Sequence, residues 1–265
     1  MAMKKLSAVH DAIVLDEAQD YLPEELSAFF KLGRVVFAAA DGRQQIYPGM
    51  TSPDDLEALF KSQVYRLKHH YRNGPKICEV ADELAKPWGG YEPLKPTSNY
   101  DDTKFPSSIE VHQATDLASQ LAAVIKLSTT QAKAYPDELI GILCPTRAVL
   151  KEVWKQIESS TIADLAVCQS ATEGYVPFQV GKPICVSTIH GAKGLEFRAA
   201  HIVSAECIRK SSLNRSIAYT GITRAKTSLS IHHSATLPTY LEGALVITKP
   251  PVRPAKLHQL FGKKK

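Results

Sequence analysis

Short apolar runs alternate with amphipathic segments along most of the chain. The apolar runs are rich in β-branched residues and contain few polar positions, which is typical of strands buried in a parallel sheet. The segments between them carry apolar residues at helical spacing, and several begin with proline or a capping residue. Strands separated by helices of this length predict an α/β fold, in which helices flank parallel sheets. We predict strands at 11–16, 34–41, 64–67, 109–113, 138–144, 165–168, 183–188, 199–204 and 227–232, and helices at 23–32, 52–61, 75–85, 116–133, 147–158 and 212–225.

Two stretches interrupt this alternation. Residues 86–107 contain four prolines and two glycines, and we expect them to form a long surface loop. Residues 249–265, KPPVRPAKLHQLFGKKK, are proline-rich and basic. We expect a solvated, disordered tail there rather than a dedicated nucleic-acid arm.

Composition describes an ordinary soluble globular protein. The 265 residues suffice for one large domain or two smaller ones, and 44% of them are apolar while 22% are charged. The net charge of +5 is compatible with a polyanionic partner but too small to establish one. No apolar run is long enough to span a membrane, and no signal peptide is recognisable. The odd number of widely spaced cysteines favours reduced thiols in a cytoplasmic protein; they are Cys78, Cys144, Cys168, Cys185 and Cys207.

Carboxylates follow the first predicted strand directly. Asp16 and Glu17 come after the apolar run 12–15, and Asp20 lies three residues further on. Open α/β sheets bind ligands at the carboxyl ends of their strands, so these side chains are expected to face a site. Two adjacent carboxylates suit Mg²⁺-dependent nucleotide hydrolysis, in which the first holds the metal ion and the second orients or deprotonates the attacking water. By itself, the pair is as typical of a surface loop as of an active site.

Four further stretches strengthen that signal. ADGRQQIY (40–47) follows the pattern GDxxQxIY, and HHYRNGPKI (69–77) places a Tyr-Arg pair before a predicted helix. VSTIHGAKGLEF (186–197) matches TxHxxKGLEF, and AYTGITRAKTSL (218–229) matches YVALTRAKxxL. With DEAQD (16–20), these stretches resemble motifs II to VI of superfamily 1 helicases, in the family's order. From about residue 9 to residue 232, the chain therefore resembles the carboxyl-terminal portion of the UvrD/Rep/PcrA-like DNA helicases.

The resemblance implies a RecA-like, P-loop-NTPase-type fold that uses ATP and Mg²⁺ and binds DNA, which we expect to be single-stranded. By their positions in the motifs, Asp16 binds the metal ion and Glu17 activates water. Gln44 senses the γ-phosphate, and Arg72 and Arg224 clamp it from the second domain. A guanidinium in that place stabilises the charge that builds on the transferring phosphoryl group.

Other motif positions imply contacts with the nucleotide and with DNA. In the family, an aromatic side chain stacks on adenine, and an acid and a glycine of motif V lie beside the nucleotide. A hydroxyl, an imidazole and an ammonium group lie against the DNA backbone, which positions a strand without reading its sequence, and a tyrosine ring stacks on a base. The residues implied in this way are Tyr71, Gly194 and Glu196 for the nucleotide, and Tyr47, Thr188, His190 and Lys193 for DNA.

The chain departs from the family's pattern at three places. IYPGM (46–50) stands where the family commonly has IYRWRGA, so the Trp and Arg that hold single-stranded DNA are replaced by residues without ring or charge. About 115 residues separate Arg72 from Thr188, too few for the extra subdomain of large family members. The motif G-x-x-x-x-G-K-[ST], whose backbone cradles the phosphates, does not occur in the sequence.

The missing P-loop shapes the expected domain organisation. We interpret residues 1–62 as part of a first RecA-like domain whose P-loop half is not in the chain. We predict that residues 63–248 form a complete second RecA-like domain without a large insertion, followed by the tail. Three functions remain open: a fragment of an ATP-dependent DNA helicase or translocase that is inactive alone; a non-enzymatic module that binds DNA or a protein; and one half of a split helicase whose Walker A half comes from another chain.

Overall fold

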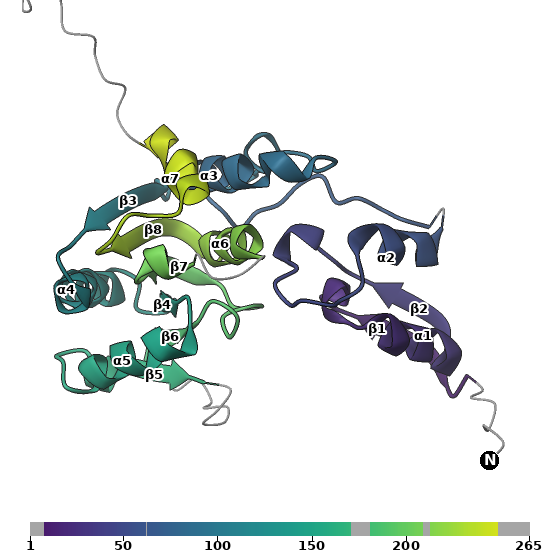
Figure 1. Cartoon of the computed structure of the whole chain (residues 1–265), viewed down its shortest axis with the longest axis horizontal. Helices are drawn as coiled ribbons and strands as arrows, with labels where there is room; N and C mark the ends of the chain where they lie inside the picture. The colour runs from purple at the N-terminus through teal and green to yellow at the C-terminus, as the bar shows by residue number, and fades with distance from the viewer. Residues whose placement is uncertain (1–7, 62, 171–180, 209–212, 249–265) are drawn as a thin grey trace, which may run out of the picture.

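The computed structural model describes residues 8–61, 63–170, 181–208 and 213–248, and within them the chain forms two α/β units that lie side by side (Figure 1). The smaller unit contains the first two strands and their helices, and the larger unit contains all later elements. The predicted disordered tail, residues 249–265, lies outside the described residues.

The smaller unit consists of two parallel strands and two helices. They are β1 (His10–Leu15), α1 (Pro23–Leu32), β2 (Gly33–Ala38) and α2 (Pro53–Phe60). Proline opens both helices, and the Ser52 hydroxyl caps α2 by accepting a hydrogen bond from the backbone N–H of Asp55 at 3.1 Å. Short 3₁₀ turns, Ala18–Asp20 and Gly42–Gln44, follow the carboxyl ends of the two strands and carry the residues of motifs II and III.

One face of this two-stranded sheet packs against the helices, and the other is exposed. Leu15 joins Leu26 and Leu56 in a small buried core. Successive side chains of a strand point to opposite faces, so Val14 and its cross-strand neighbour Phe37 point away from that core and are 77% and 60% exposed. The prediction that both strands are buried is wrong for this face, because within the described residues α1 and α2 cover only the other side.

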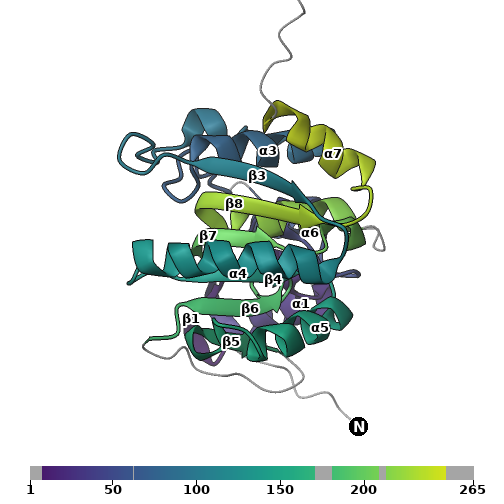
Figure 2. The same ribbon diagram turned by 90° about the vertical axis from the view of Figure 1, so that its left-hand side faces the viewer.

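The larger unit is built on a sheet of six parallel strands in the order β3-β8-β7-β4-β6-β5 (Figure 2). Parallel neighbours need crossover connections, and helices provide most of them. The elements are α3 (Pro75–Ala85), β3 (Ser108–Gln113), α4 (Leu117–Ala134), β4 (Ile140–Cys144), α5 (Arg147–Glu158), β5 (Ala166–Gln169), β6 (Ile184–Thr188), β7 (Phe197–Ile202), α6 (Asn214–Thr223), β8 (Ala225–His233) and α7 (Thr239–Leu245).

Helices cover both faces of the six-stranded sheet. On one face, α4 and α5 pack over Ile140 and Ile142 of β4. On the other face, α3, α6 and α7 pack over Leu143, whose side chain alternates with that of Ile142 in the same strand. All five residues of β4 are buried, as expected for a central parallel strand.

The predicted α/β class, with a parallel sheet flanked by helices, is confirmed. The predicted strand at 64–67 is wrong: these residues pair with no strand in the described part of the chain, and Tyr65 and Leu67 are 91% and 96% exposed. The short helix α7 was not predicted; it spans only seven residues and contains Gly243. Residues 86–107 form a loop with two 3₁₀ turns, Lys86–Trp88 and Lys95–Thr97.

Candidate functional site

The candidate site lies where the two 3₁₀ turns of the smaller unit meet the loop after β6 and the carboxyl end of α6. Asp16 directly follows β1, is exposed, and accepts a hydrogen bond from the backbone N–H of Glu17 at 2.9 Å. Glu17 has a left-handed backbone, with φ of 51°. Residues other than glycine adopt this conformation rarely, and it occurs preferentially where the surroundings fix a side chain for function.

Lys193 connects the loop after β6 to the acids of the smaller unit. Its Nζ donates to Asp20 Oδ2 at 2.5 Å and to the backbone carbonyl of Gln44 at 3.0 Å, and it lies 3.3 Å from Glu17 Oε2. The Lys193 side chain is only 8% exposed. Burial raises the pKa of Asp20, and the nearby ammonium group opposes that shift. The structure therefore places Lys193 on the acid side of the site, and its predicted contact with DNA stays a prediction.

Arg224 joins the two units from the other side. Its Nη2 donates to Gln44 Oε1 at 2.5 Å, and its remaining N–H groups reach the carbonyls of Thr220 and Leu195 at 3.2 and 3.3 Å. The residue is 1% exposed, and burial together with the nearby Arg72 lowers the pKa of its guanidinium to about 10. Arg224 is thus still charged at neutral pH, but it has no carboxylate partner within ion-pair distance among the described residues.

Arg72 lies close enough to Arg224 to lower the pKa of its guanidinium. The neighbouring Asn73 holds this segment against the residues on both sides of Arg224. The Asn73 side-chain amide donates to the carbonyls of Thr223 and Ala225, the two residues that flank Arg224, at 2.9 and 2.6 Å. Arg72 itself pairs with Glu196 at 2.6 Å.

The remaining residues predicted to contact the nucleotide are Tyr71, Gly194 and Glu196. Tyr71 is 73% exposed, so its ring is open to solvent. Gly194 has a φ of +81°, a conformation that requires glycine, and it lies between Lys193 and Glu196. The structure brings Glu17, Gln44, Arg72, Arg224 and Glu196 together through direct contacts or shared partners, whereas Tyr71 and Asp16 stand at the exposed margin.

The end of β6 and the start of the loop after it, with Thr188, His190 and Gly191, line a pocket of about 530 Å³. Tyr47 and His190 line it, with ring centroids 5.6 Å apart, and Thr188 lies beside them. Burial lowers the pKa of His190, so its imidazole is neutral at pH 7. Thr146 and Arg147, at the start of α5, line the same pocket.

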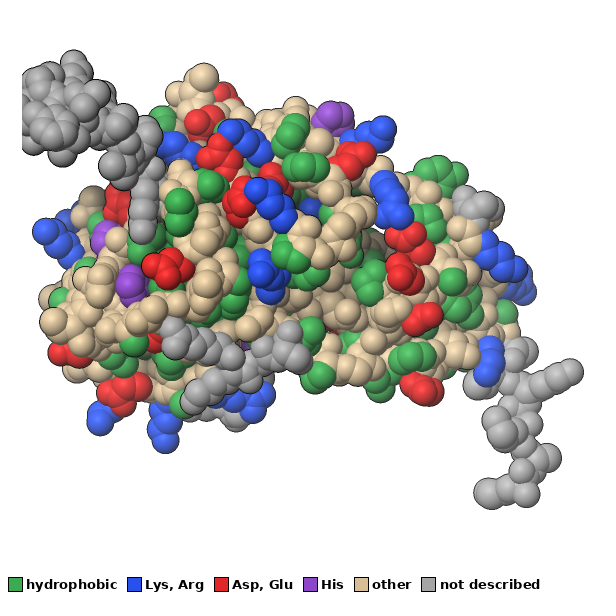
Figure 3. Space-filling view, turned by 45° about the horizontal axis from the view of Figure 1, so that its top comes forward, with side chains coloured by type: hydrophobic (Ala, Val, Ile, Leu, Met, Phe, Trp, Pro, Cys, Tyr) green, Lys and Arg blue, Asp and Glu red, His purple; other side chains and the backbone are tan. Residues whose placement is uncertain are grey.

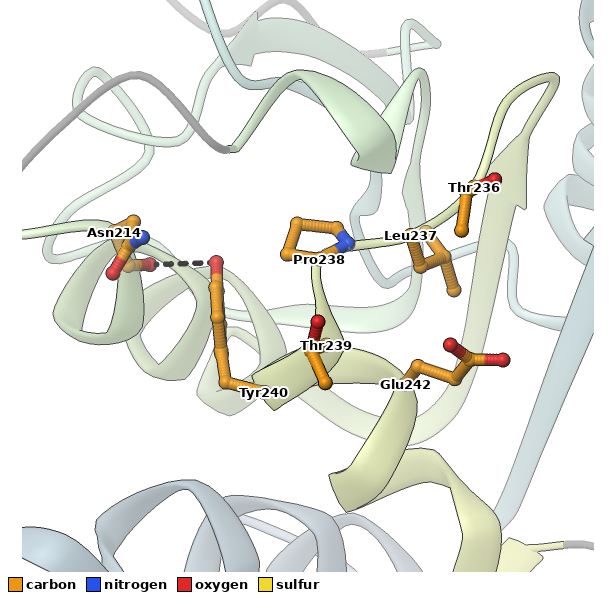
Figure 4. A pocket seen from close by; sticks show the side chains of 7 residues that line it. All are labelled: Asn214, Thr236, Leu237, Pro238, Thr239, Tyr240 and Glu242. Carbon is orange, nitrogen blue, oxygen red and sulfur yellow. Dashed lines mark hydrogen bonds between the residues drawn. The ribbon is translucent and has the colours of Figure 1, made fainter.

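A second pocket, of about 540 Å³, contains none of the predicted residues (Figure 4). It lies between Asn214 and the segment 236–242, where the Tyr240 hydroxyl donates to the Asn214 carbonyl at 3.2 Å. It is therefore not part of the candidate site.

Sequence reasoning missed three contributors to the site. Asn73 is recognisable only as the residue after the Tyr-Arg pair, and its reach to α6 and β8 spans 150 positions of sequence. Asp20 was noticed as a third acid, but its partner Lys193 is 173 positions away. Arg147 is the first residue of α5 and lines the pocket. Whether a residue at the start of a helix lines a pocket depends on how the sheet packs, which the local sequence does not indicate.

Comparison with known proteins agrees with the motifs. Residues 183–231, which include all of motifs V and VI, match the family model of the UvrD-like helicase C-terminal domain. No curated protein matches the chain.

Two solved structures are similar to parts of this chain. The C-terminal domain of a possible DNA helicase from Lactobacillus plantarun WCFS1 is 17% identical, with a TM-score of 0.45 over 64% of this chain and 91% of that domain. The PRRSV helicase is 15% identical, with a TM-score of 0.47 over 83% of this chain. This chain covers 34% of the length of the PRRSV helicase.

The family match runs from β6 into β8 and includes Thr188, Lys193 and Arg224. It supports a helicase-type function at the level of the family. The resemblance to UvrD-like helicases, predicted from the motifs, is confirmed over residues 183–231.

Proposed function

We propose that this chain is part of an ATP-dependent DNA helicase or translocase of superfamily 1, and that it is inactive without a segment that carries a P-loop. The contact between Arg224 and Gln44, 2.5 Å long and formed across the two units, carries this proposal. Two residues expected to meet the same γ-phosphate already touch each other, although 180 positions separate them in sequence.

Arg72 and Arg224 are proposed to hold the terminal phosphate. Two guanidinium groups that approach each other repel, and burial adds to the cost of charging Arg224. A phosphate relieves both costs, because its oxygens accept charge-assisted hydrogen bonds from both groups. Arginines that act in this way contribute roughly 10³ to 10⁵ in rate in phosphoryl transfer.

Asp16 is proposed to bind Mg²⁺ and Glu17 to orient the attacking water. The donor set suits a hard cation, because carboxylate oxygens are the ligands that Mg²⁺ prefers. Asp20 Oδ1 is buried and has no hydrogen-bond partner among the described residues, which leaves an oxygen with unused capacity beside the pair. A bound Mg²⁺ supplies charge neutralisation for the phosphate oxygens.

The missing phosphate loop is proposed to come from another segment that completes the first RecA-like domain, in the same polypeptide or in a partner chain. The exposed face of the two-stranded sheet, with Val14, Val35 and Phe37, supports this proposal. An apolar sheet face of this kind normally lies under a helix, and its strands normally have neighbours on both sides.

The cytoplasm is the proposed location, because buried Cys78, Cys144 and Cys185 are free thiols.

DNA is proposed to pass along the pocket that contains Tyr47, Thr188 and His190. On the face shown in Figure 3, Lys and Arg side chains are interspersed with Asp and Glu, so that view offers no broad basic surface. The contacts that we propose for DNA are ring stacking at Tyr47 and phosphate contacts at Thr188 and Arg147.

The test is Mg²⁺-dependent ATP hydrolysis by the chain alone and mixed with a separately purified P-loop half of a first domain, with and without single-stranded DNA. We expect hydrolysis only in the mixture, and its loss in Glu17→Gln and in Arg224→Ala. Hydrolysis by the chain alone that Glu17→Gln abolishes would show that no added P-loop is needed. Activity of the mixture that survives Arg224→Ala would contradict the role of that arginine.

A further inference from the structure

Lys193 is the buried cation of the acid cluster in the smaller unit. Asp16, Glu17 and Asp20 lie within five residues of each other, and the Lys193 ammonium group contacts two of them. A lysine only 8% exposed loses most of its hydration, so its position depends on these carboxylates. Glu17 is held further by Gln19, whose side-chain amide donates to the same Oε2 at 2.5 Å.

A divalent cation held by Asp16 would attract the same carboxylate oxygens of Glu17 and Asp20. Glu17 Oε2 and Asp20 Oδ2 face the ammonium group, whereas Asp20 Oδ1 is buried without a partner among the described residues. Placing a second cation next to the ammonium group adds repulsion at short range. Electrostatic repulsion therefore prevents Lys193 and a divalent cation from binding fully to these carboxylates at the same time.

We propose that Lys193 is a positioning residue that competes with the divalent cation for the carboxylates of Glu17 and Asp20. This inference rests on the function proposed above, because it concerns the same metal site. The ammonium group supplies at these oxygens part of the positive charge that a metal ion would supply. Cation binding then requires the loop that carries Lys193 to release the two acids.

The loop after β6 connects this competition to the rest of the site. Within nine residues it carries Thr188 and His190 beside the pocket, Lys193 at the acids, and Glu196 at Arg72. Its turns are closed by short hydrogen bonds, such as Gly191 N–H to Thr188 Oγ1 at 2.9 Å and Ala192 N–H to the Thr188 carbonyl at 2.9 Å. A displacement at Lys193 is thus transmitted to neighbouring contacts of the same loop.

The experiment measures Mn²⁺ binding to the 265-residue chain by electron paramagnetic resonance of the free ion, without nucleotide. We expect Lys193→Met to bind Mn²⁺ about tenfold more tightly than the unmodified chain, because the competing charge is gone. Lys193→Arg keeps the charge and should leave the affinity within about twofold. Lys151→Met, which removes an exposed lysine of α5, is the matched control and should also leave it unchanged.

A second substitution localises the effect. Adding Asp20→Asn to Lys193→Met should remove the gain in affinity, because it deletes a carboxylate that the freed site uses. If Lys193→Met fails to fold by circular dichroism, Lys193→Gln keeps a hydrogen-bond donor without the charge and should show the same gain. Equal Mn²⁺ affinities of the unmodified chain and the folded uncharged variant would overturn the role of Lys193.

The failure of this inference is distinguishable from the failure of the proposed function. Binding of single-stranded DNA by the unmodified chain is recorded separately by fluorescence anisotropy. Absence of that binding would contradict the proposed function, whereas the Mn²⁺ comparison decides the competition by Lys193.

Discussion

The two units of the molecule are built from the same kind of strand and helix but differ in how completely their sheets are covered. The six-stranded sheet has helices on both faces, and all of β4 is buried. The two-stranded sheet is covered on one face, and its other face exposes Val14 and Phe37. The candidate site draws Arg72 and Arg224 from the larger unit, and Asp16, Glu17 and Asp20 from the smaller unit. One part of the site is therefore carried by a sheet covered on both faces, and the other by a sheet covered on one face within the described residues.

Core truncation should show the largest contrast between the units. Ile142→Ala, in β4 where the side chain is fully buried, should lower the free energy of unfolding by about 2–5 kcal/mol through lost packing and a residual cavity. Val14→Ala, in β1 on the exposed face, should change it by less than about 0.5 kcal/mol. Urea unfolding followed by circular dichroism measures both. Similar losses for the two variants would show that the face of β1 is covered in solution.

Acid should destabilise the larger unit in particular, because it buries two neutral histidines. Burial lowers the pKa of His201 to about 3 and of His232 to about 2. His201 Nε2 donates to Gln131 Oε1 at 2.8 Å, so its Nδ1, 3.2 Å from His232 Nε2, accepts from that ring when both are neutral. His232 Nδ1 is buried and has no hydrogen-bond partner among the described residues.

The sign of the pH effect follows from these shifts. Below the unfolded pKa of about 6.5, the unfolded chain binds protons that the folded chain does not, so stability is full above that pH and falls as the pH drops. We expect a loss of about 1.4 kcal/mol per pH unit for each histidine. Both tryptophans, Trp88 and Trp154, lie in the larger unit, so their fluorescence in urea reports its stability.

Two variants sharpen that measurement. His201→Gln should reduce the slope of stability against pH between pH 7 and pH 5, whatever its effect at neutral pH. His69→Gln, which changes an exposed histidine of the connecting segment, should leave the slope as it is. An unchanged slope in His201→Gln would mean that this ring does not control the acid sensitivity.

Asn73→Ala tests the connection that places the two arginines side by side. The substitution leaves the carbonyls of Thr223 and Ala225 without the donor they have now, and we expect a loss of about 1–3 kcal/mol in unfolding free energy. Asn99→Ala, at an exposed asparagine of the 86–107 loop, is the matched control and should have little effect. Tryptophan fluorescence in urea measures both, and equal stabilities would show that water replaces the amide without cost.

The smallest effect is expected at the surface of the smaller unit. Arg34 and Asp11 form an ion pair of 3.3 Å with side chains that are 70% and 92% exposed. Arg34→Gln should cost less than about 1 kcal/mol, and less still at high salt, because water and ions screen exposed pairs. Thermal unfolding at low and high salt measures this, and a larger, salt-independent loss would point to packing by the arginine stem.

The sequence predicted the larger unit well, because its strands and helices obey the periodicities of a sheet covered on both faces. The predicted helix at 147–158 coincides with α5, and the apolar run 138–144 contains β4. The prediction failed at residues 64–67, whose apolar and β-branched composition is typical of a strand. Composition reports a preference for pairing, but pairing needs a neighbouring strand, and the described chain provides none there.

The candidate site was predictable in its members but not in their partners. The motifs name Gln44 and Arg224, yet no local pattern indicates that they touch each other or that Lys193 meets Asp20. Such contacts depend on how two separate units dock, which is decided by side chains more than a hundred positions apart.

Among the described helices, none combines the length and apolar character that a membrane span requires.

The exposed face of the two-stranded sheet also bears on the tendency of the purified chain to self-associate. Val14, Val35 and Phe37 present apolar surface next to strand edges that are open within the described residues. Open edges beside apolar side chains favour self-association of identical copies. We therefore expect the purified chain to self-associate through that face as its concentration rises.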